Sequence, residues 1–208
     1  MEETGTCDQT LIIFTSDHGE LLGDYRIFGK ASFYPEAYHV PLIIVDPSRE
    51  ANAHRGHIVQ NFSEGVDVLP TILEWLGLNS DPSLDGRSLL SYISGQNDPK
   101  PKTHVLCEHD FRNDRETYFV GDMALDRRHR SLSMVLDEHA FYVRFSGLPD
   151  LCFKIDEFEG LHYHYATGIE ADKIRIWGLT TQLDHRLKNA TNGRTALVAT
   201  DKGFELRG

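Results

Sequence analysis

The sequence predicts an α/β protein with an antiparallel sheet in its second half. Two short apolar runs, residues 10–15 (TLIIFT) and 39–46 (HVPLIIVD), have the composition of fully buried strands. Near-continuous apolar strands are typical of a sheet that helices cover on both faces. Three later runs, residues 131–137, 139–146 and 150–156, are separated by tight turns, which is the pattern of an antiparallel meander.

A helix is predicted over residues 63–77 (SEGVDVLPTILEWLG). Ser63 is a candidate N-cap and Gly77 a candidate C-cap, because these residue types favour the two ends of a helix. Pro70 should kink this helix or mark the start of its second half. Four apolar residues recur at the spacing of one helical face: Val66, Leu69, Leu73 and Leu76.

The remaining segments suggest how the chain is divided. Residues 19–38, rich in Gly and aromatic residues, predict an ordered loop with a helical turn, and a loop of this length is usually functional. The polar, Pro-rich stretch 79–102 predicts a crossing between two parts of the chain. A second helix is predicted over 169–188. We therefore expect one domain over residues 1–100 and a smaller domain, with antiparallel strands and a helix, over 101–208.

Composition narrows the classes of partner. The 208 residues include 32 acidic and 21 basic side chains, for a formal net charge of -11, which argues against a nucleic-acid partner. No run of 18 apolar residues occurs, so no membrane span is predicted. The first residues are polar and acidic and lack a signal-peptide pattern, and the three cysteines form no CxxC motif. These features predict a cytoplasmic protein with reduced cysteines.

Asp17 and His18 follow the first apolar run directly, in the stretch FTSDHGELLGD. Ligand sites of open α/β sheets lie just beyond the carboxyl ends of strands, and Gly19 gives the chain freedom to turn there. A carboxylate and an imidazole together make a common half-shell for a divalent metal. The bare pair also fits a second interpretation, in which Asp17 caps a turn and His18 is a surface histidine.

The surrounding motifs carry a resemblance to a known family. The pattern TSDHGE-x-x-GD, followed by FGK and then by E-x-x-H-VPLII, resembles the sulfatase and alkaline phosphatase superfamily, and most of all its phosphonate monoester hydrolase and arylsulfatase branch. The resemblance continues through VDVLPTILEWLGL, LDGRSLL and EHDFR and covers nearly all of the chain. It implies an alkaline-phosphatase-like fold, of which this chain would form the carboxy-terminal part: the last strands of the large mixed sheet and a small carboxy-terminal α+β domain.

The resemblance also implies roles for individual residues. Asp17 and His18 match the pair that ligates the catalytic divalent metal, with Mn, Zn, Ca and Mg all left open. Lys30, in the FGK segment, matches the lysine that contacts the transferred group of a small anionic ester substrate. The sequence leaves two further roles open: Glu20 is either near the metal or solvated, and Arg87 either orients a loop or touches substrate.

The nucleophile of the superfamily is not encoded here. That nucleophile is commonly a formylglycine made from the Cys or Ser of a C/S-x-P/A-x-R motif, and neither Cys7, Cys107, Cys152 nor any serine of this chain lies in one. We therefore expect a fragment of an ester hydrolase that is inactive alone and either forms a homo-oligomer or needs an amino-terminal half. A noncatalytic remnant with a binding or assembly role is the alternative, and a phosphodiesterase or phosphomutase relative is a third possibility.

Overall fold

The structure, a computed structural model, describes residues 2–96, 98, 100–110, 119–120, 123–124, 131–145, 151–154, 164–165, 196–200 and 203–207. The α-helices are α1 (Pro35–Tyr38), α2 (Val68–Trp75) and α3 (Leu90–Ile93), and the 3-10 helices are η1 (Glu2–Thr4), η2 (Cys7–Gln9), η3 (Asp24–Arg26), η4 (Glu50–His54) and η5 (Gly65–Asp67). The strands are β1 (Ile12–Thr15), β2 (Leu42–Val45), β3 (His104–Asp110), β4 (Phe119–Val120), β5 (Met123–Ala124), β6 (Ser131–Asp137), β7 (Ala140–Phe145), β8 (Leu151–Lys154), β9 (His164–Tyr165), β10 (Ala196–Thr200) and β11 (Gly203–Arg207). The helix predicted over 169–188 lies outside the described residues.

The chain forms two compact units. The first contains Met1–Lys30 and Glu36–Thr103, and the second contains Ala31–Pro35 and His104–Gly208. Among the described residues, no helix is long and apolar enough to cross a membrane.

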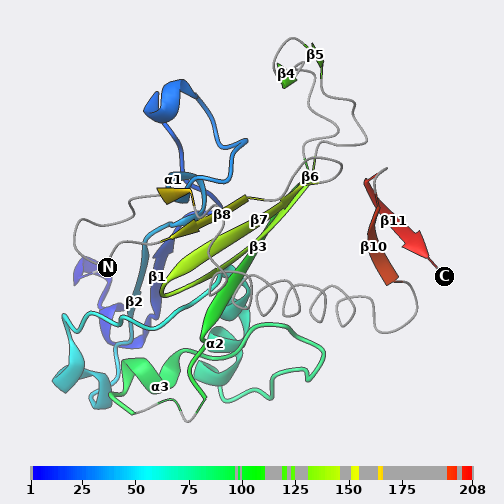
Figure 1. Cartoon of the computed structure of the whole chain (residues 1–208). Helices are drawn as coiled ribbons and strands as arrows, with labels where there is room; N and C mark the ends of the chain where they lie inside the picture. Colours follow the sequence, from blue (N-terminus) through cyan, green and yellow to red (C-terminus); the bar gives the residue numbers. More distant parts are fainter. Residues whose placement is uncertain are drawn as a thin grey trace. The chain divides into compact units, whose positions relative to one another are not determined.

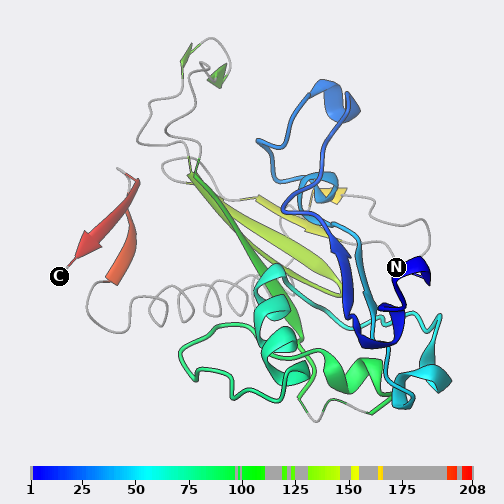
Figure 2. The same cartoon turned by 180° about the vertical axis from the view of Figure 1, so that it is seen from behind.

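In the first unit, β1 and β2 pair antiparallel, with Ile12 opposite Val45 and Thr15 opposite Leu42 (Figure 2). Both apolar runs therefore form strands, as predicted, but the prediction that they are fully buried is wrong. Ile12, Phe14 and Ile43 are 41%, 59% and 55% exposed. Apolar composition indicates that a strand is suited to burial. Whether it is buried also depends on a layer that covers it, and no described segment covers these two strands.

The 3-10 helix η5, which leads directly into α2, begins with a cap that the sequence pattern did not identify. The cap is Glu64 rather than Ser63: its side chain accepts the backbone N–H of Asp67, while Asp67 Oδ2 accepts the Glu64 N–H at 2.8 Å. This reciprocal pair is a capping box, which satisfies two backbone donors at once. Pro70 lies in the first turn of α2, where its missing N–H would have no helical partner, so it is accommodated without a break.

The end of α2 confirms Gly77 as its cap. Gly77 has a φ of +70° and donates its N–H to the Glu74 carbonyl at 2.9 Å, and Leu78 donates to the Leu73 carbonyl at 2.8 Å. These two bonds form a Schellman motif, which requires a left-handed residue at that position.

The apolar face predicted for α2 is largely exposed in this chain. Val66, Leu69 and Leu76 are 46%, 50% and 55% exposed. The buried side is the opposite one, where Thr71 Oγ1 accepts the Leu89 N–H at 2.9 Å. The periodic pattern thus predicted the helix but not which face of it is buried.

The second unit is built on a five-stranded antiparallel sheet in the order β3-β6-β7-β8-β9 (Figure 1). The meander predicted from the three later runs is confirmed by β6, β7 and β8, and β3 is an additional strand that pairs with β6. The core of this sheet includes Val135 and Tyr142, with Leu106 packed against them. Two further strand pairs, β4–β5 and β10–β11, form separate two-stranded sheets.

Candidate active site

The end of β1 turns sharply at Ser16, Asp17 and His18. Ser16 Oγ donates to the carbonyl oxygen of His18 at 2.6 Å, and the His18 N–H donates to Asp17 Oδ1 at 3.0 Å. One carboxylate oxygen of Asp17 therefore fixes the turn. The turn interpretation and the ligand interpretation of Asp17 use different oxygens, so they are compatible.

The other oxygen of Asp17 faces the histidine ring. Asp17 Oδ2 lies 3.6 Å from His18 Nε2, and His18 Nδ1 lies 2.8 Å from the carbonyl oxygen of Gly19. Because that carbonyl can only accept, the contact places the proton of neutral His18 on Nδ1 and leaves a lone pair on Nε2. Two donors on one tetrahedral ion, at bonds of about 2.1 Å, are separated by roughly 3.4 Å. The pair therefore fits a divalent ion.

The pair makes only part of a metal shell. The Asp17 side chain is 85% exposed and that of His18 is 37% exposed. Among the residues that the structure describes, no group of three or more His, Cys, Asp or Glu side chains converges on one point. A tetrahedral or octahedral ion would need further donors from outside this set.

Gly19 allows the backbone next to the Asp17–His18 pair to approach the α1 segment closely. Its N–H donates to the Ala37 carbonyl at 2.9 Å, and a Cβ added to Gly19 would lie well inside van der Waals distance of the Glu36 carbonyl oxygen. The backbone next to His18 is therefore packed directly on the α1 segment, at a separation that only glycine allows.

The loop after Gly19 folds back on itself and is closed by Glu20. The Glu20 carboxylate accepts the N–H of Gly29, and Leu21 donates its N–H to the Gly29 carbonyl at 3.2 Å. Glu20 therefore has a role that the sequence left undecided: it closes the loop that leads to Lys30. The backbone beside Lys30 is thus brought within hydrogen-bonding distance of the residues that follow the Asp-His pair, while the Lys30 side chain is exposed.

The same loop contains unusual backbone conformations. Three residues other than glycine, Leu22, Tyr25 and Arg26, have φ values of 51°, 53° and 62°. Such conformations are uncommon and cluster near functional sites, where the surrounding structure holds them in place. Leu22 and Phe28 of this loop are also 78% and 80% exposed, which is unusual for large apolar side chains.

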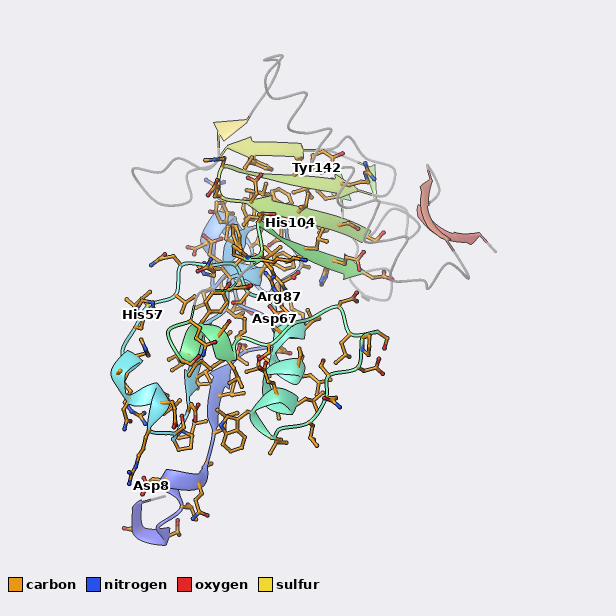
Figure 3. All side chains as sticks on the ribbon, turned by 90° about the horizontal axis from the view of Figure 1, so that it is seen from below. Asp8, His57, Asp67, Arg87, His104 and Tyr142 are labelled. Carbon is orange, nitrogen blue, oxygen red and sulfur yellow. The ribbon has the colours of Figure 1, made fainter. Side chains whose placement is uncertain are left out.

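Arg87, for which the sequence left two roles open, lies in a partly buried polar cluster. Its backbone N–H donates to Asp67 Oδ1 at 2.9 Å (Figure 3), and its guanidinium lies 3.5 Å from Asp98. Lys102 completes the cluster, with Nζ bonded to Glu64 and 2.8 Å from both oxygens of Asp67. These contacts assign Arg87 a loop-orienting role. Sequence reasoning missed Asp67 and Lys102, whose 35-residue separation leaves no local pattern.

Comparisons with known proteins give the family. The family model described as Sulfatase matches residues 1–78. The chain is 42% identical to the multifunctional alkaline phosphatase superfamily protein PehA of Trinickia caryophylli, over 94% of this chain and 38% of that protein. It is 39% identical to arylsulfatase K of Bos taurus, over 92% of this chain and 33% of that protein.

Solved structures agree with these relatives. The phosphonate monoester hydrolase SpPMH from Silicibacter pomeroyi matches with a TM-score of 0.77 and 31% identity, over 99% of this chain and 40% of that one. The phosphonate monoester hydrolase of Agrobacterium radiobacter matches with a TM-score of 0.74 and 31% identity, over 100% of this chain and 41% of that one.

The chain belongs to the sulfatase and alkaline phosphatase superfamily, and the predicted alkaline-phosphatase-like fold is confirmed. It spans between about a third and two fifths of the length of these relatives, from 33% of arylsulfatase K to 41% of the solved structure from Agrobacterium radiobacter.

Proposed function

We propose that this chain contributes part of the active site of a metal-dependent hydrolase that acts on phosphonate or phosphate monoesters or on sulfate esters. The observation that carries the proposal is the pairing of Asp17 Oδ2 with His18 Nε2 at the end of β1, 3.6 Å apart, within the residues that match the Sulfatase model. Asp17 and His18 supply two ligands of a divalent ion, and Lys30 contacts the anionic group of the substrate.

Each residue has a distinct chemical task in this proposal. A bound divalent ion polarises a nonbridging oxygen of the ester. The His18 Nδ1 contact with the Gly19 carbonyl holds the ring with Nε2 3.6 Å from Asp17 Oδ2. The ammonium group of Lys30 offsets the negative charge that develops on the transferred group. Because its side chain is exposed, Lys30 can reach a substrate without displacing a bonded partner.

In this proposal another polypeptide segment supplies the nucleophile. The 208 residues contain no C/S-x-P/A-x-R motif from which a formylglycine could form. Loss of a covalent nucleophile removes several orders of magnitude in rate, so the chain by itself is expected to be inactive. We assign residues 1–100 to the catalytic domain and 101–208 to a small carboxy-terminal domain. The two compact units support this division, since they separate after Thr103, except that Ala31–Pro35 belongs to the second unit.

The partner that fits best is an amino-terminal half of the same superfamily. The first unit exposes large apolar side chains on β1, on β2, on α2 and directly beside α2, among them Ile12, Phe14, Ile43, Val66, Leu69 and Leu76. Exposed apolar strands and helix faces mark surfaces that another chain covers. A second copy of this chain would cover them as a homo-oligomer but would bring no nucleophile.

Calorimetric titration with Mn²⁺ and Zn²⁺ tests the metal site. The intact chain should bind one ion, and the Asp17→Ala and His18→Ala variants should each lose most of that heat. Asp8→Ala is the matched control, since Asp8 is an exposed acidic residue far from the pair in the sequence. Equal metal binding by the intact chain and both variants would contradict the assignment of Asp17 and His18 as metal ligands.

A noncatalytic role in binding or assembly is the second candidate. The absence of a nucleophile motif from the 208 residues favours it for the chain as it stands. The genomic sequence directly upstream of Met1 separates the two candidates. An in-frame C-x-P-S-R-type motif there supports the hydrolase, whereas unrelated sequence supports the remnant.

A further inference from the structure

The five residues Ala31–Pro35 follow Lys30 directly but belong to the second unit. Within that unit, the ring of Phe33 lies 5.6 Å from that of Phe153 in a stacked arrangement and 5.9 Å from that of Phe145, edge to face. Both geometries are the favourable ones for aromatic pairs. Phe33 is thus attached to the sheet by two ring contacts.

The sheet that receives Phe33 is itself rigidly packed at this point. Phe153 stacks on Phe141 with ring centroids 4.5 Å apart, and these two residues face each other in the register of β7 and β8. Phe141 and Phe153 are 1% and 7% exposed, so the rings form part of the core of the second unit. Phe33 adds a third ring to this stack.

The segment around Phe33 is also held through its own backbone. Ser32 is 6% exposed, and its Oγ accepts the Tyr34 N–H at 3.2 Å. On the other side of Lys30, the Gly29 N–H is bonded to the Glu20 carboxylate. Only Lys30 and Ala31 lie between these two attachments, so the Lys30 backbone is restrained from both directions while its side chain is exposed.

We infer that Phe33 is a positioning residue for Lys30, acting through the aromatic stack of β7 and β8. The inference rests on the proposed role of Lys30 in holding the anionic ester. Phe33 then acts without touching the substrate, because its ring contacts restrain the backbone three residues after Lys30. Preorganisation of this kind matters because a charged group is most effective when it need not reorient during the reaction.

Limited trypsin digestion of the full 208-residue chain tests the anchor, because trypsin cleaves after Lys30 only when the flanking backbone is released. Phe33→Ala should raise the cleavage rate at Lys30 about tenfold, as expected from the loss of two aromatic contacts. Phe33→Tyr keeps the ring and should restore the original rate. Cleavage after Arg55, in the same samples, should be unchanged. Equal acceleration at Lys30 and Arg55, or no acceleration at Lys30, would overturn the anchor.

A second arm of the same digestion separates the anchor from the function of Lys30. Inorganic phosphate, at ionic strength matched with chloride, should slow cleavage at Lys30 in the unmodified chain. The bound anion pairs with the Lys30 ammonium group, which trypsin must otherwise bind. The protection should be weaker in Phe33→Ala and should return in Phe33→Tyr. If phosphate protects neither protein while Phe33→Ala still accelerates cleavage, the anchor stands and the role of Lys30 in the proposed function fails. Equal phosphate protection in the unmodified chain and in Phe33→Ala would overturn the positioning role.

Discussion

Gly29 donates its backbone N–H to the carboxylate of Glu20, nine residues earlier in the chain. This bond joins the two motifs on which the family resemblance depends, DHGE and FGK. Together with the bond from the Leu21 N–H to the Gly29 carbonyl, it turns a linear pattern into a closed loop. The Asp-His pair and Lys30 are therefore connected by a short hydrogen-bonded path rather than by eleven freely moving residues.

Replacing Glu20 tests this loop closure. Glu20→Ala removes the acceptor of the Gly29 N–H, whereas Glu20→Gln keeps an acceptor oxygen in the same place. At an exposed site such a bond is worth about 1 kcal/mol, so hydrogen exchange at Gly29 should accelerate about fivefold in Glu20→Ala and little in Glu20→Gln. Glu74→Ala, an exposed glutamate on α2, is the matched control and should leave Gly29 unchanged. Unaltered protection of Gly29 in Glu20→Ala would contradict the loop closure.

Gly19→Ala tests the close approach beside His18. The added methyl group would collide with the Glu36 carbonyl oxygen, which belongs to the backbone and cannot rotate away. We expect a loss of about 1–3 kcal/mol in unfolding free energy, measured by urea denaturation, and weaker metal binding because His18 moves with its neighbour. Gly65→Ala is the control, since a Cβ there meets nothing within 4 Å and should be nearly neutral. If both variants unfold at the same urea concentration as the parent chain, the packing argument is wrong.

The sequence was informative where a local pattern determines structure, and silent where structure depends on distant partners. The strands Ile12–Thr15 and Leu42–Val45 could be located because apolar residues cluster there. Their apolar composition alone could not predict this exposure, because it depends on which other segments cover them. The cap of η5 shows the same limit on a smaller scale: Ser63 has the favoured residue type, but the cap is Glu64, because Asp67 forms the reciprocal bond with it.

The candidate site also contains residues that the sequence could identify and residues that it could not. A motif identified Asp17, His18 and Lys30, and the structure adds the geometry of the first two, with Nε2 3.6 Å from Oδ2. The supporting contacts of Phe33 had no signal in the sequence, because an aromatic residue in a loop does not reveal which sheet receives it. Contacts of this kind join segments more than a hundred residues apart.

Lys102→Met tests the buried ion cluster at the start of α2. The side chains of Lys102 and Asp67 are 12% and 0% exposed, so removal of the ammonium group leaves the Asp67 carboxylate buried beside that of Glu64 with no cation. Breaking such a pair from one side costs about 3–5 kcal/mol, which should appear as a lower urea midpoint. Lys100→Met, at an exposed neighbouring lysine, should change stability by less than about 0.5 kcal/mol. Similar midpoints for the two variants would show that the cluster contributes little.

Asp98 gives the chain an acid-dependent component of stability. The backbone N–H of Lys100, at 2.8 Å, lowers the pKa of Asp98 from its ordinary value of 3.8, and the hydroxyl of Tyr92 and the charge of Arg87 act in the same direction. Because the folded pKa is the lower one, the ionised carboxylate stabilises the fold fully above pH 3.8, and this contribution is lost as the pH falls through the folded value. Asp98→Asn removes the titrating group, so its melting temperature should lie below that of the parent chain near neutral pH. The gap should close as the pH falls from about 4 to about 2. Asp8→Asn, at an exposed position, should show no such convergence, and a gap that widens in acid for Asp98→Asn would reverse the assigned sign.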